Sequence, residues 1–134
     1  MLIQNAIKIT EKNRKPIYLK SCFRHDFRVH VFKDGSCVAV DGGLDYARRV
    51  GTVPAGIKMT DFSLDYKSHP LRVRNRLLWG TLGKNGKGKH KFVRLCDCSK
   101  AHLVAILQLN ISPLYRDVIE HLLASRIKAK KIRI

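Results

Sequence analysis

The sequence is poor in acidic residues, with 10 Asp and Glu against 27 Lys and Arg, which gives a formal net charge of +17 at pH 7. It also has no apolar stretch near the roughly 18 residues that cross a bilayer, so we expect no membrane partner. Gln4, Asn5 and Lys8 interrupt the first ten positions, so we expect no secretory signal. With 134 residues, 45% of them hydrophobic, the chain predicts one compact domain, or two very small ones, with a polyanionic partner.

Cysteine is scarce as well, with four residues at positions 22, 37, 96 and 98. In a chain without a secretory signal, a reducing compartment favours free thiols over two disulfides. Cys96 and Cys98 form a C-x-C, which is tighter than the C-x2-C of a zinc knuckle. A zinc ion held by Cys22, Cys37 and either His25 or His30 is the alternative. Because that spacing is irregular, we expect free thiols and no metal or other cofactor.

Signatures of common enzymes are missing: the chain has no G-x-S-x-G, H-E-x-x-H or Walker A pattern. A histidine beside a carboxylate can act as a general acid or base, or hold a divalent metal. The residues of this kind are His25, Asp26, His30 and Asp41. No second carboxylate pair accompanies them, so the sequence favours structural hydrogen bonds and a binding protein. A metal-dependent nuclease is the alternative.

Positive charge is concentrated in the second half of the chain. Residues 1–69 hold 12 bases and 7 acids, whereas residues 70–134 hold 15 bases and 3 acids. No acid occurs between Asp65 and Asp97, where nine bases fall. We therefore expect contact with a polyanion to centre on residues 67–94.

Apolar and polar alternation predicts an N-terminal β-meander over residues 1–51, with strands near residues 3–9, 17–19 and 37–40. Asp34-Gly35 marks a hairpin, because glycine accepts the positive φ of the primed turns. Residues 44–50 predict a turn-rich or short helical segment, and residues 52–67 a connecting loop. A half-buried strand is indicated where Phe27, Val29 and Val31 alternate with Arg28, His30 and Phe32.

Residues 68–134 predict a basic α+β part, so the expected fold class is α+β. Ser68 is the expected cap of a helix with Pro70 in its first turn, and a basic hairpin follows, with strands at 79–82 and 92–95. Asp97 or Ser99 is expected to cap a second helix that ends at 109. A third helix opens at 112–113 and decays into a basic tail from residue 126. Its expected buried face is Leu114, Val118, Leu122 and Leu123.

Basic residues in four segments are the candidate phosphate ligands. The turn at residues 83–91 combines three glycines with four lysines, which suits backbone and point-charge contacts with phosphate. Arginines in adjoining segments offer bidentate contacts, and the tail offers sequence-indifferent attraction. A solvated turn and a solubilising tail are the alternatives. The candidates are Arg48, Arg49, Arg72, Arg76, Lys84, Lys87, Lys89, Lys91, Arg94, Lys128, Lys130 and Lys131.

The run Asp41-Gly42-Gly43, followed by Asp45, Tyr46, Arg48 and Arg49, is denser in special residues than a plain turn requires. Two interpretations stay open: a rigid structural corner, in which the carboxylates clamp an arginine, or a ligand site.

Three motifs stand out along the chain: His25-Asp26-Phe27, Val40-Asp41-Gly42-Gly43-x-x-Tyr46-x-Arg48-Arg49-x-Gly51 and Trp79-Gly80-Thr81-x-Gly83-Lys84-x-Gly86. In these motifs the chain resembles small accessory proteins of tailed bacteriophages and prophages, and the likeness runs from about residue 5 to residue 126. Many such relatives carry an N-terminal cysteine ribbon, whereas this chain has no cysteine near Ile9 or Asn13. The resemblance implies a phage accessory protein in the cytoplasm of the infected bacterium, and it implies no particular activity.

We therefore expect a non-enzymatic phage accessory protein that binds nucleic acid, or a host machine containing nucleic acid, through a basic surface. Two other hypotheses stay open. One is an inhibitor of a host defence or transcription factor with an acidic surface. The other is a pocket that sequesters a phosphorylated nucleotide signal, built from the glycine–lysine turn and Arg48-Arg49.

Overall fold

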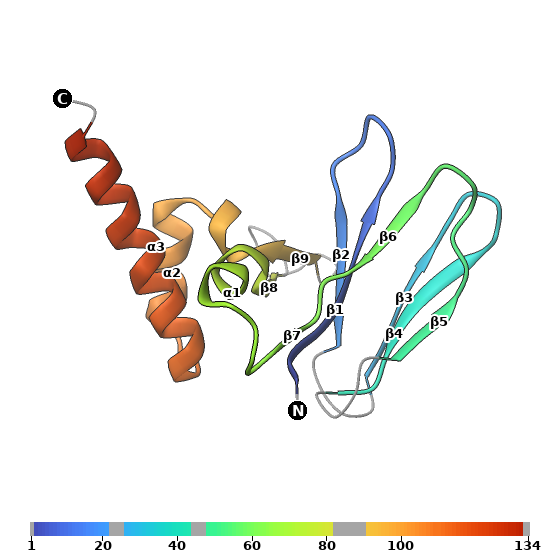
Figure 1. The fold of residues 1–134 in the computed structure, drawn as a ribbon, viewed down its shortest axis with the longest axis horizontal. Helices are drawn as coiled ribbons and strands as arrows, with labels where there is room; N and C mark the ends of the chain where they lie inside the picture. Colours follow the sequence, from blue (N-terminus) through green and yellow to red (C-terminus); the bar gives the residue numbers. More distant parts are fainter. Residues whose placement is uncertain (1, 22–25, 44–47, 82–90, 133–134) are drawn as a thin grey trace. The chain divides into compact units, whose positions relative to one another are not determined.

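The computed structural model describes residues 2–21, 26–43, 48–81 and 91–132. Its contacts divide the chain into two compact units: the first unit is Met1–Ser68 with Leu78–Val93, and the second unit is His69–Leu77 with Arg94–Ile134. Antiparallel strands make up the described part of the first unit and helices dominate the second (Figure 1). The predicted α+β class is confirmed.

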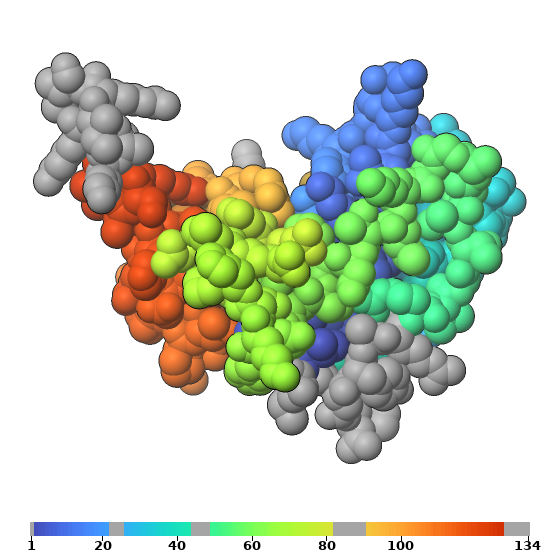
Figure 2. Space-filling view, in the orientation of Figure 1, coloured from blue at the N-terminus to red at the C-terminus, as the bar shows by residue number. Residues whose placement is uncertain are grey.

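Strand β1 (Leu2–Thr10) is the centre of the first unit (Figure 1). It pairs antiparallel with β2 (Ile17–Ser21) on one side and with β6 (Lys58–Asp61) and β7 (Leu64–Asp65) on the other. The tip of the β1–β2 hairpin projects from the surface of this unit (Figure 2). The polar residues between β1 and β2 thus form the end of a long ribbon.

A second sheet is a meander of β3 (Phe27–Val31), β4 (Cys37–Asp41) and β5 (Arg48–Gly51), in that order. The predicted Asp34-Gly35 turn joins β3 to β4: Gly35 has φ +89°, and the Asp34 carboxylate accepts a hydrogen bond from the Ser36 N–H at 2.9 Å. That bond and the Ser36 hydroxyl lower the pKa of Asp34. A third, two-stranded sheet pairs β8 (Leu78–Thr81) with β9 (Lys91–Arg94).

Apolar side chains lie on both faces of β1, because successive residues of a strand point to opposite sides. One core cluster combines Ile7 and Ile9 with Phe32, Val38 and Val40 of the second sheet region. The other combines Ala6, Phe62, Leu78 and Phe92, with Tyr18 packed against them. Strand β1 is therefore buried on both sides, which explains the full burial of its polar residues Gln4 and Asn5.

The second unit contains α1 (Pro70–Arg76), the 3-10 turn η1 (Leu95–Asp97), α2 (Lys100–Leu107) and α3 (Pro113–Ile132). The Ser99 side chain accepts from the His102 N–H and so caps α2, one of the two predicted alternatives. A backbone hydrogen bond from Leu95 to Leu77, at 3.0 Å, ties η1 to the end of α1. None of the described helices is long and apolar enough to cross a membrane.

Two segments differ from their predicted structure. Residues 48–51 form strand β5 rather than a helical turn, and the predicted loop over residues 52–67 contains β6 and β7. Both errors have one cause: these short strands gain stability from partners that are distant in sequence, so their local pattern is weak. The division by contacts places the β8–β9 hairpin, up to Val93, with the β-rich unit.

Strand β3 has the predicted period of two but the opposite face is buried. Phe27, Val29 and Val31 are 53%, 42% and 64% exposed, whereas Arg28 and His30 are half-buried. The inward side is already filled by valines of β4 and isoleucines of β1, and the Arg28 guanidinium lies 5.6 Å from the centre of the Phe92 ring. Packing against the neighbouring strands, rather than the polarity of the β3 residues, therefore determines which face of β3 is turned inward.

The helix ends also differ from prediction. His69, not Ser68, caps α1, through its Nδ1 and the Leu71 N–H at 3.1 Å, while the Ser68 hydroxyl accepts from the Asp65 N–H. Helix α3 continues to Ile132 and does not decay at residue 126. Its most buried residues are Val118 and Ile119, whereas the predicted Leu114, Leu122 and Leu123 are half-buried.

Candidate functional site

The two N-terminal motifs meet in one backbone corner of the first unit. The Gly42 N–H donates to the Asp26 carbonyl at 3.2 Å, and the Ser21 hydroxyl donates to the Gly42 carbonyl. The amide of the buried Asn5 donates to the carbonyls of Asp41 and Gly43 at 3.0 and 3.1 Å. Buried backbone groups need such partners, so the Asp41-Gly42-Gly43 run acts as a structural corner.

The catalytic candidates do not converge. Asp26 is buried and forms an ion pair with Arg28 at 2.8 Å, whereas His30 lies four residues further along β3, about 13 Å away in an extended strand. Asp41 lies opposite Phe27, on the other face of the sheet from these groups, and His25 lies outside the described residues. In the described part of the chain, no three His, Cys, Asp or Glu side chains gather closely enough to hold a metal ion.

The Arg49 guanidinium makes several hydrogen bonds within the fold, so we call it a structural hub rather than a free anion ligand. Its guanidinium donates to the Asn5 side chain at 2.7 Å, the Ala6 carbonyl at 2.8 Å, the Ser63 hydroxyl at 2.7 Å and Asp61 at 2.8 Å. Burial alone would raise the pKa of Asp61, but the Ser63 hydrogen bonds and the Arg49 guanidinium outweigh it and lower that pKa. Because these bonds join β5 to β1 and to the end of β6, we withdraw Arg49 as a phosphate ligand.

Arg49→Met is expected to lower the free energy of unfolding by about 2 kcal/mol, because the Asn5 side-chain oxygen, the Ala6 carbonyl and the Ser63 hydroxyl each lose a hydrogen bond from a charged donor. Asp61→Asn is the matched control: Asp61 is 67% exposed, so its charge adds little. The stabilisation that the Asp61 carboxylate contributes is present above the pKa of Asp61 in the unfolded chain. It is lost as pH falls through the lower pKa of Asp61 in the folded protein. Urea denaturation at neutral pH separates the two variants, and equal losses would contradict the assignment of Arg49 as a hub.

The remaining basic candidates are scattered over both units. Arg94 is held by the Asp97 carboxylate through two bonds of 2.9 and 3.0 Å, so its charge is already balanced. Arg72 is exposed on α1, and Arg76 is half-buried there with partners of its own. Arg48 opens β5, and Lys128, Lys130 and Lys131 lie in the last turns of α3. Lys84, Lys87 and Lys89 lie outside the described residues.

Strand pairing brings together a group of lysines that the sequence did not single out. Lys8 of β1 lies opposite Tyr18 of β2 and opposite Thr60 of β6. Lys20 lies opposite Ala6, and Lys58 opposite Thr10. Directly paired residues share a face of a sheet, and so do alternate residues of one strand. Lys8, Lys20 and Lys58 therefore stand around Tyr18 on one face, where no position of β1, β2 or β6 aligned with them is acidic.

A groove of about 400 Å³ lies beside Tyr18, lined by β2, the turn before it and β9. Tyr18 and the buried Phe92 contribute aromatic surface, and the exposed Lys15 and Lys91 contribute charge. We call the set Lys8, Lys15, Lys20, Lys58 and Lys91, together with Tyr18, the lysine face.

Four of the five lysines of this face have no carboxylate partner among the described residues. The Lys20 ammonium donates to the Leu78 carbonyl at 3.4 Å, and within the described ranges no carboxylate is paired with Lys8, Lys15, Lys58 or Lys91. Diagonal neighbours on a sheet are about 7–8 Å apart, so their like charges repel by about 0.5 kcal/mol per pair in water. An anion bound among them removes that repulsion, whereas an uncharged ligand does not.

Sequence reasoning found only Lys91 of this set. Lys8 and Lys58 each stand between two apolar residues, and Lys20 follows Leu19, which is a recognisable signal of a strand with one polar face. That signal does not reveal that β6 pairs with β1 across almost fifty residues, and this pairing is what gathers the lysines.

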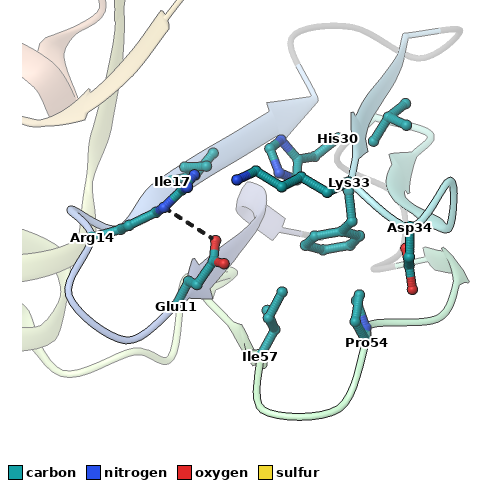
Figure 3. Close-up of a pocket in the computed structure, with 10 residues that line it drawn as sticks. Glu11, Arg14, Ile17, His30, Lys33, Asp34, Pro54 and Ile57 are labelled. Carbon is teal, nitrogen blue, oxygen red and sulfur yellow. Dashed lines mark ion pairs between the residues drawn. The ribbon is translucent and has the colours of Figure 1, made fainter.

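Another pocket of the first unit, of about 250 Å³, lies between the β1–β2 turn and the β3–β4 turn (Figure 3). Its rim mixes the Glu11–Arg14 ion pair with Lys33 and Asp34, and the His30 ring packs edge-on against Phe32 at 4.9 Å. The mixed charge makes it a poorer site for a polyanion than the lysine face.

Three of the cysteines are described, and all three are free thiols: Cys37 is exposed, Cys96 half-buried and Cys98 buried. Burial raises the pKa of Cys96 and Cys98, so both stay protonated at neutral pH. Cys22 lies outside the described residues, so the proposed zinc ligands Cys22 and His25 are not placed.

No protein-family model, curated protein or solved structure matches this chain. The resemblance to phage accessory proteins therefore stays a prediction from the motifs.

Proposed function

We propose that the protein is a non-enzymatic phage accessory protein that binds single-stranded nucleic acid through the lysine face, in the cytoplasm of the infected bacterium. One observation carries the binding proposal. Strand register places Lys8, Lys20 and Lys58 on the same sheet face as Tyr18, with no carboxylate among the aligned positions, and Lys15 and Lys91 line the aromatic groove beside Tyr18. The phage context rests on the motif resemblance alone.

The chemistry of this face favours a single strand over a duplex. A lysine ammonium is a point charge that contacts phosphate without reading sequence, and a groove with aromatic walls accepts an unstacked base. Tyr18 packs at 5.1 Å, ring centre to ring centre, against Phe62 and so is held in place beside Lys15 and Lys91. No recognition helix lies in this unit to enter a major groove, as far as the described residues show.

The alternative of a nucleotide-sequestering pocket, built from the glycine–lysine turn and Arg48-Arg49, is less favoured, and that turn lies outside the described residues. The Arg49 guanidinium is occupied by β1 and the end of β6, so a phosphate would have to displace four hydrogen bonds.

Lys58→Glu combined with Lys91→Glu is expected to weaken binding of a short labelled single strand by at least about 20-fold at moderate salt, because two phosphate contacts are lost. Removing two contacts also reduces the slope of log K against log salt by about 1.4. Fluorescence anisotropy at several salt concentrations measures both quantities.

The matched control is Lys33→Glu combined with Lys67→Glu, which makes the same change in net charge at exposed lysines away from this face. Equal weakening by both double variants would show attraction by net charge alone and would rule out the lysine face. Tighter binding of a duplex of the same length would rule out the single-strand preference.

A further inference from the structure

An apolar groove in the second unit is independent of the lysine face. It has a volume of about 140 Å³ and lies between α2 and α3. Val104 of α2 and Leu123 and Ile127 of α3 form its apolar surface, and Lys100 and Arg126 supply its charge. Val104 is 40% exposed and Ile127 54% exposed, which is unusual for two large aliphatic residues beside each other on a small unit.

The lengths of the two helices explain why this groove stays open. At 1.5 Å per residue, the eight residues of α2 extend about 12 Å and the twenty of α3 about 30 Å. Since residues 108–112 join them in a short turn, the start of α2 reaches only as far as Arg126 and Ile127 of α3. Helix α3 continues beyond that point (Figure 1), so the groove lies where the shorter helix begins.

Arg126 is fixed in an orientation that suits a carboxylate. Its Nη2 donates to the Cys96 carbonyl at 3.1 Å, which holds the guanidinium at the edge of the groove. A guanidinium has five N–H donors and binds a carboxylate through two of them. Because the arginine is already held in place, a carboxylate binds it with a smaller loss of side-chain entropy.

Charge decides between the possible occupants. The second unit holds 11 basic and 3 acidic residues, so two copies of it repel each other. Its acids are Asp97, which pairs with Arg94, and Asp117 and Glu120 of α3, and none of them lines the groove. A nucleic acid would satisfy Lys100 and Arg126 but leave the aliphatic surface uncovered. An apolar surface with a cation from each helix matches a helix that carries apolar residues on one side and acids beside them.

We infer that the α2–α3 groove is a docking site for an acidic amphipathic helix of a partner protein. The apolar side of that helix covers Val104, Leu123 and Ile127, and its carboxylates bind Lys100 and Arg126. This site is separate from the lysine face, so one chain can hold nucleic acid and an acidic protein through different units.

Three synthetic peptides test the inference with the full chain. The first places leucines at helical spacing among glutamates, the second has the same composition in scrambled order, and the third replaces the glutamates by lysines. We expect the first to bind at least about five-fold more tightly than the second and the third not to bind. Its binding is expected to shift the methyl NMR signals of Val104, Leu123 and Ile127.

Lys100→Glu combined with Val104→Asn is expected to lower the affinity for the first peptide by at least about five-fold, since the double substitution removes one positive charge and one apolar contact at exposed positions. The matched control is Arg72→Glu combined with Leu109→Asn, which makes the same substitutions at exposed residues of this unit outside the groove. Unchanged amide spectra show that both variants fold.

Several results would overturn this docking site. The scrambled peptide could bind as tightly as the first peptide, or the control variant could lose as much affinity for the first peptide as Lys100→Glu with Val104→Asn does. The methyl signals that shift could belong to residues outside the groove. The protein could also form a concentration-dependent dimer that Lys100→Glu with Val104→Asn abolishes. Binding to anionic vesicles but to none of the peptides would identify a membrane surface instead. The Lys58→Glu, Lys91→Glu variant is expected to bind the first peptide normally, so failure of nucleic-acid binding and failure of this proposal are distinguishable.

Discussion

Gly51→Ala is expected to lower the free energy of unfolding by about 4 kcal/mol, a large part of the stability of a small domain. Gly51 has φ +95° and lies opposite Val38 in the β4–β5 pair. A Cβ at this position would stand 2.1 Å from the Cys37 carbonyl oxygen and 3.0 Å from its carbon. Both neighbours are backbone atoms of a sheet, so neither can turn aside as a side chain would, and β5 has to move away from β4.

Displacement of β5 by Gly51→Ala also affects contacts outside the β4–β5 pair. The Thr52 N–H donates to the same Cys37 carbonyl, and Arg49, two residues before Gly51, joins β5 to β1. Displacing β5 therefore weakens the hub as well as the pair. Gly35→Ala is the matched control: Gly35 has φ +89° but nothing within 4 Å of an added Cβ, so the cost is only the backbone term of about 1–2 kcal/mol. Urea denaturation of both variants gives the comparison, and a loss at Gly51 no larger than at Gly35 would refute the steric argument.

Gln4→Leu is expected to destabilise the first unit by about 2–6 kcal/mol, because two buried hydrogen bonds to backbone groups are lost at about 1–3 kcal/mol each. Gln4 is fully buried in β1. Its amide donates to the Phe62 carbonyl at 2.9 Å, and its side-chain oxygen accepts from the Leu78 N–H at 2.8 Å. One side chain thus joins β1 to the segment after β6 and to the first residue of β8. Leucine has a similar volume, so the loss measures the hydrogen bonds rather than a cavity.

Gln4→Glu separates the hydrogen bonds from packing. A protonated carboxyl can donate to Phe62 and accept from Leu78, as the amide does, whereas a carboxylate cannot donate. Burial raises the pKa of such a glutamate in the folded state, so its stabilising contribution is complete below the unfolded pKa and is lost as pH rises through the folded pKa. We expect the stability of Gln4→Glu relative to the unaltered protein to fall between mildly acidic and neutral pH, while that of Gln4→Leu stays constant. A pH-independent difference for both variants would contradict the pairing of Gln4.

Elements with local signals were predictable. The Asp34-Gly35 turn and the Ser99 cap each depend on a side chain and a backbone group within three residues of each other, so their chemistry can be read from neighbouring letters. Pro113 opens α3 for the same reason. The exposed apolar face of β3 was not predictable, because the strand pattern is symmetric and only the layers packed on it distinguish its two sides.

The candidate site also combines features that the sequence predicts with features that depend on tertiary structure. The chain has an excess of positive charge and has no acidic residue between Asp65 and Asp97. Both features can be read from the sequence, and they are sufficient to predict a polyanionic partner. They pointed to residues 67–94 as one surface, yet the structure divides that window between two units. Arg49 and Arg94, which in sequence look like free cations, are held by the fold.

The sequence by itself therefore determined the α+β class, the short-range turns and caps, and the excess of positive charge. Only the tertiary structure decided which lysines share a face. Lys8, Lys20 and Lys58 come together because β1 pairs with β2 through a local hairpin and with β6 through a contact across almost fifty residues. A change of one residue in that register would turn Lys58 to the opposite face of the sheet. Composition sets how much charge the chain carries, and the pairing of distant strands sets where that charge acts.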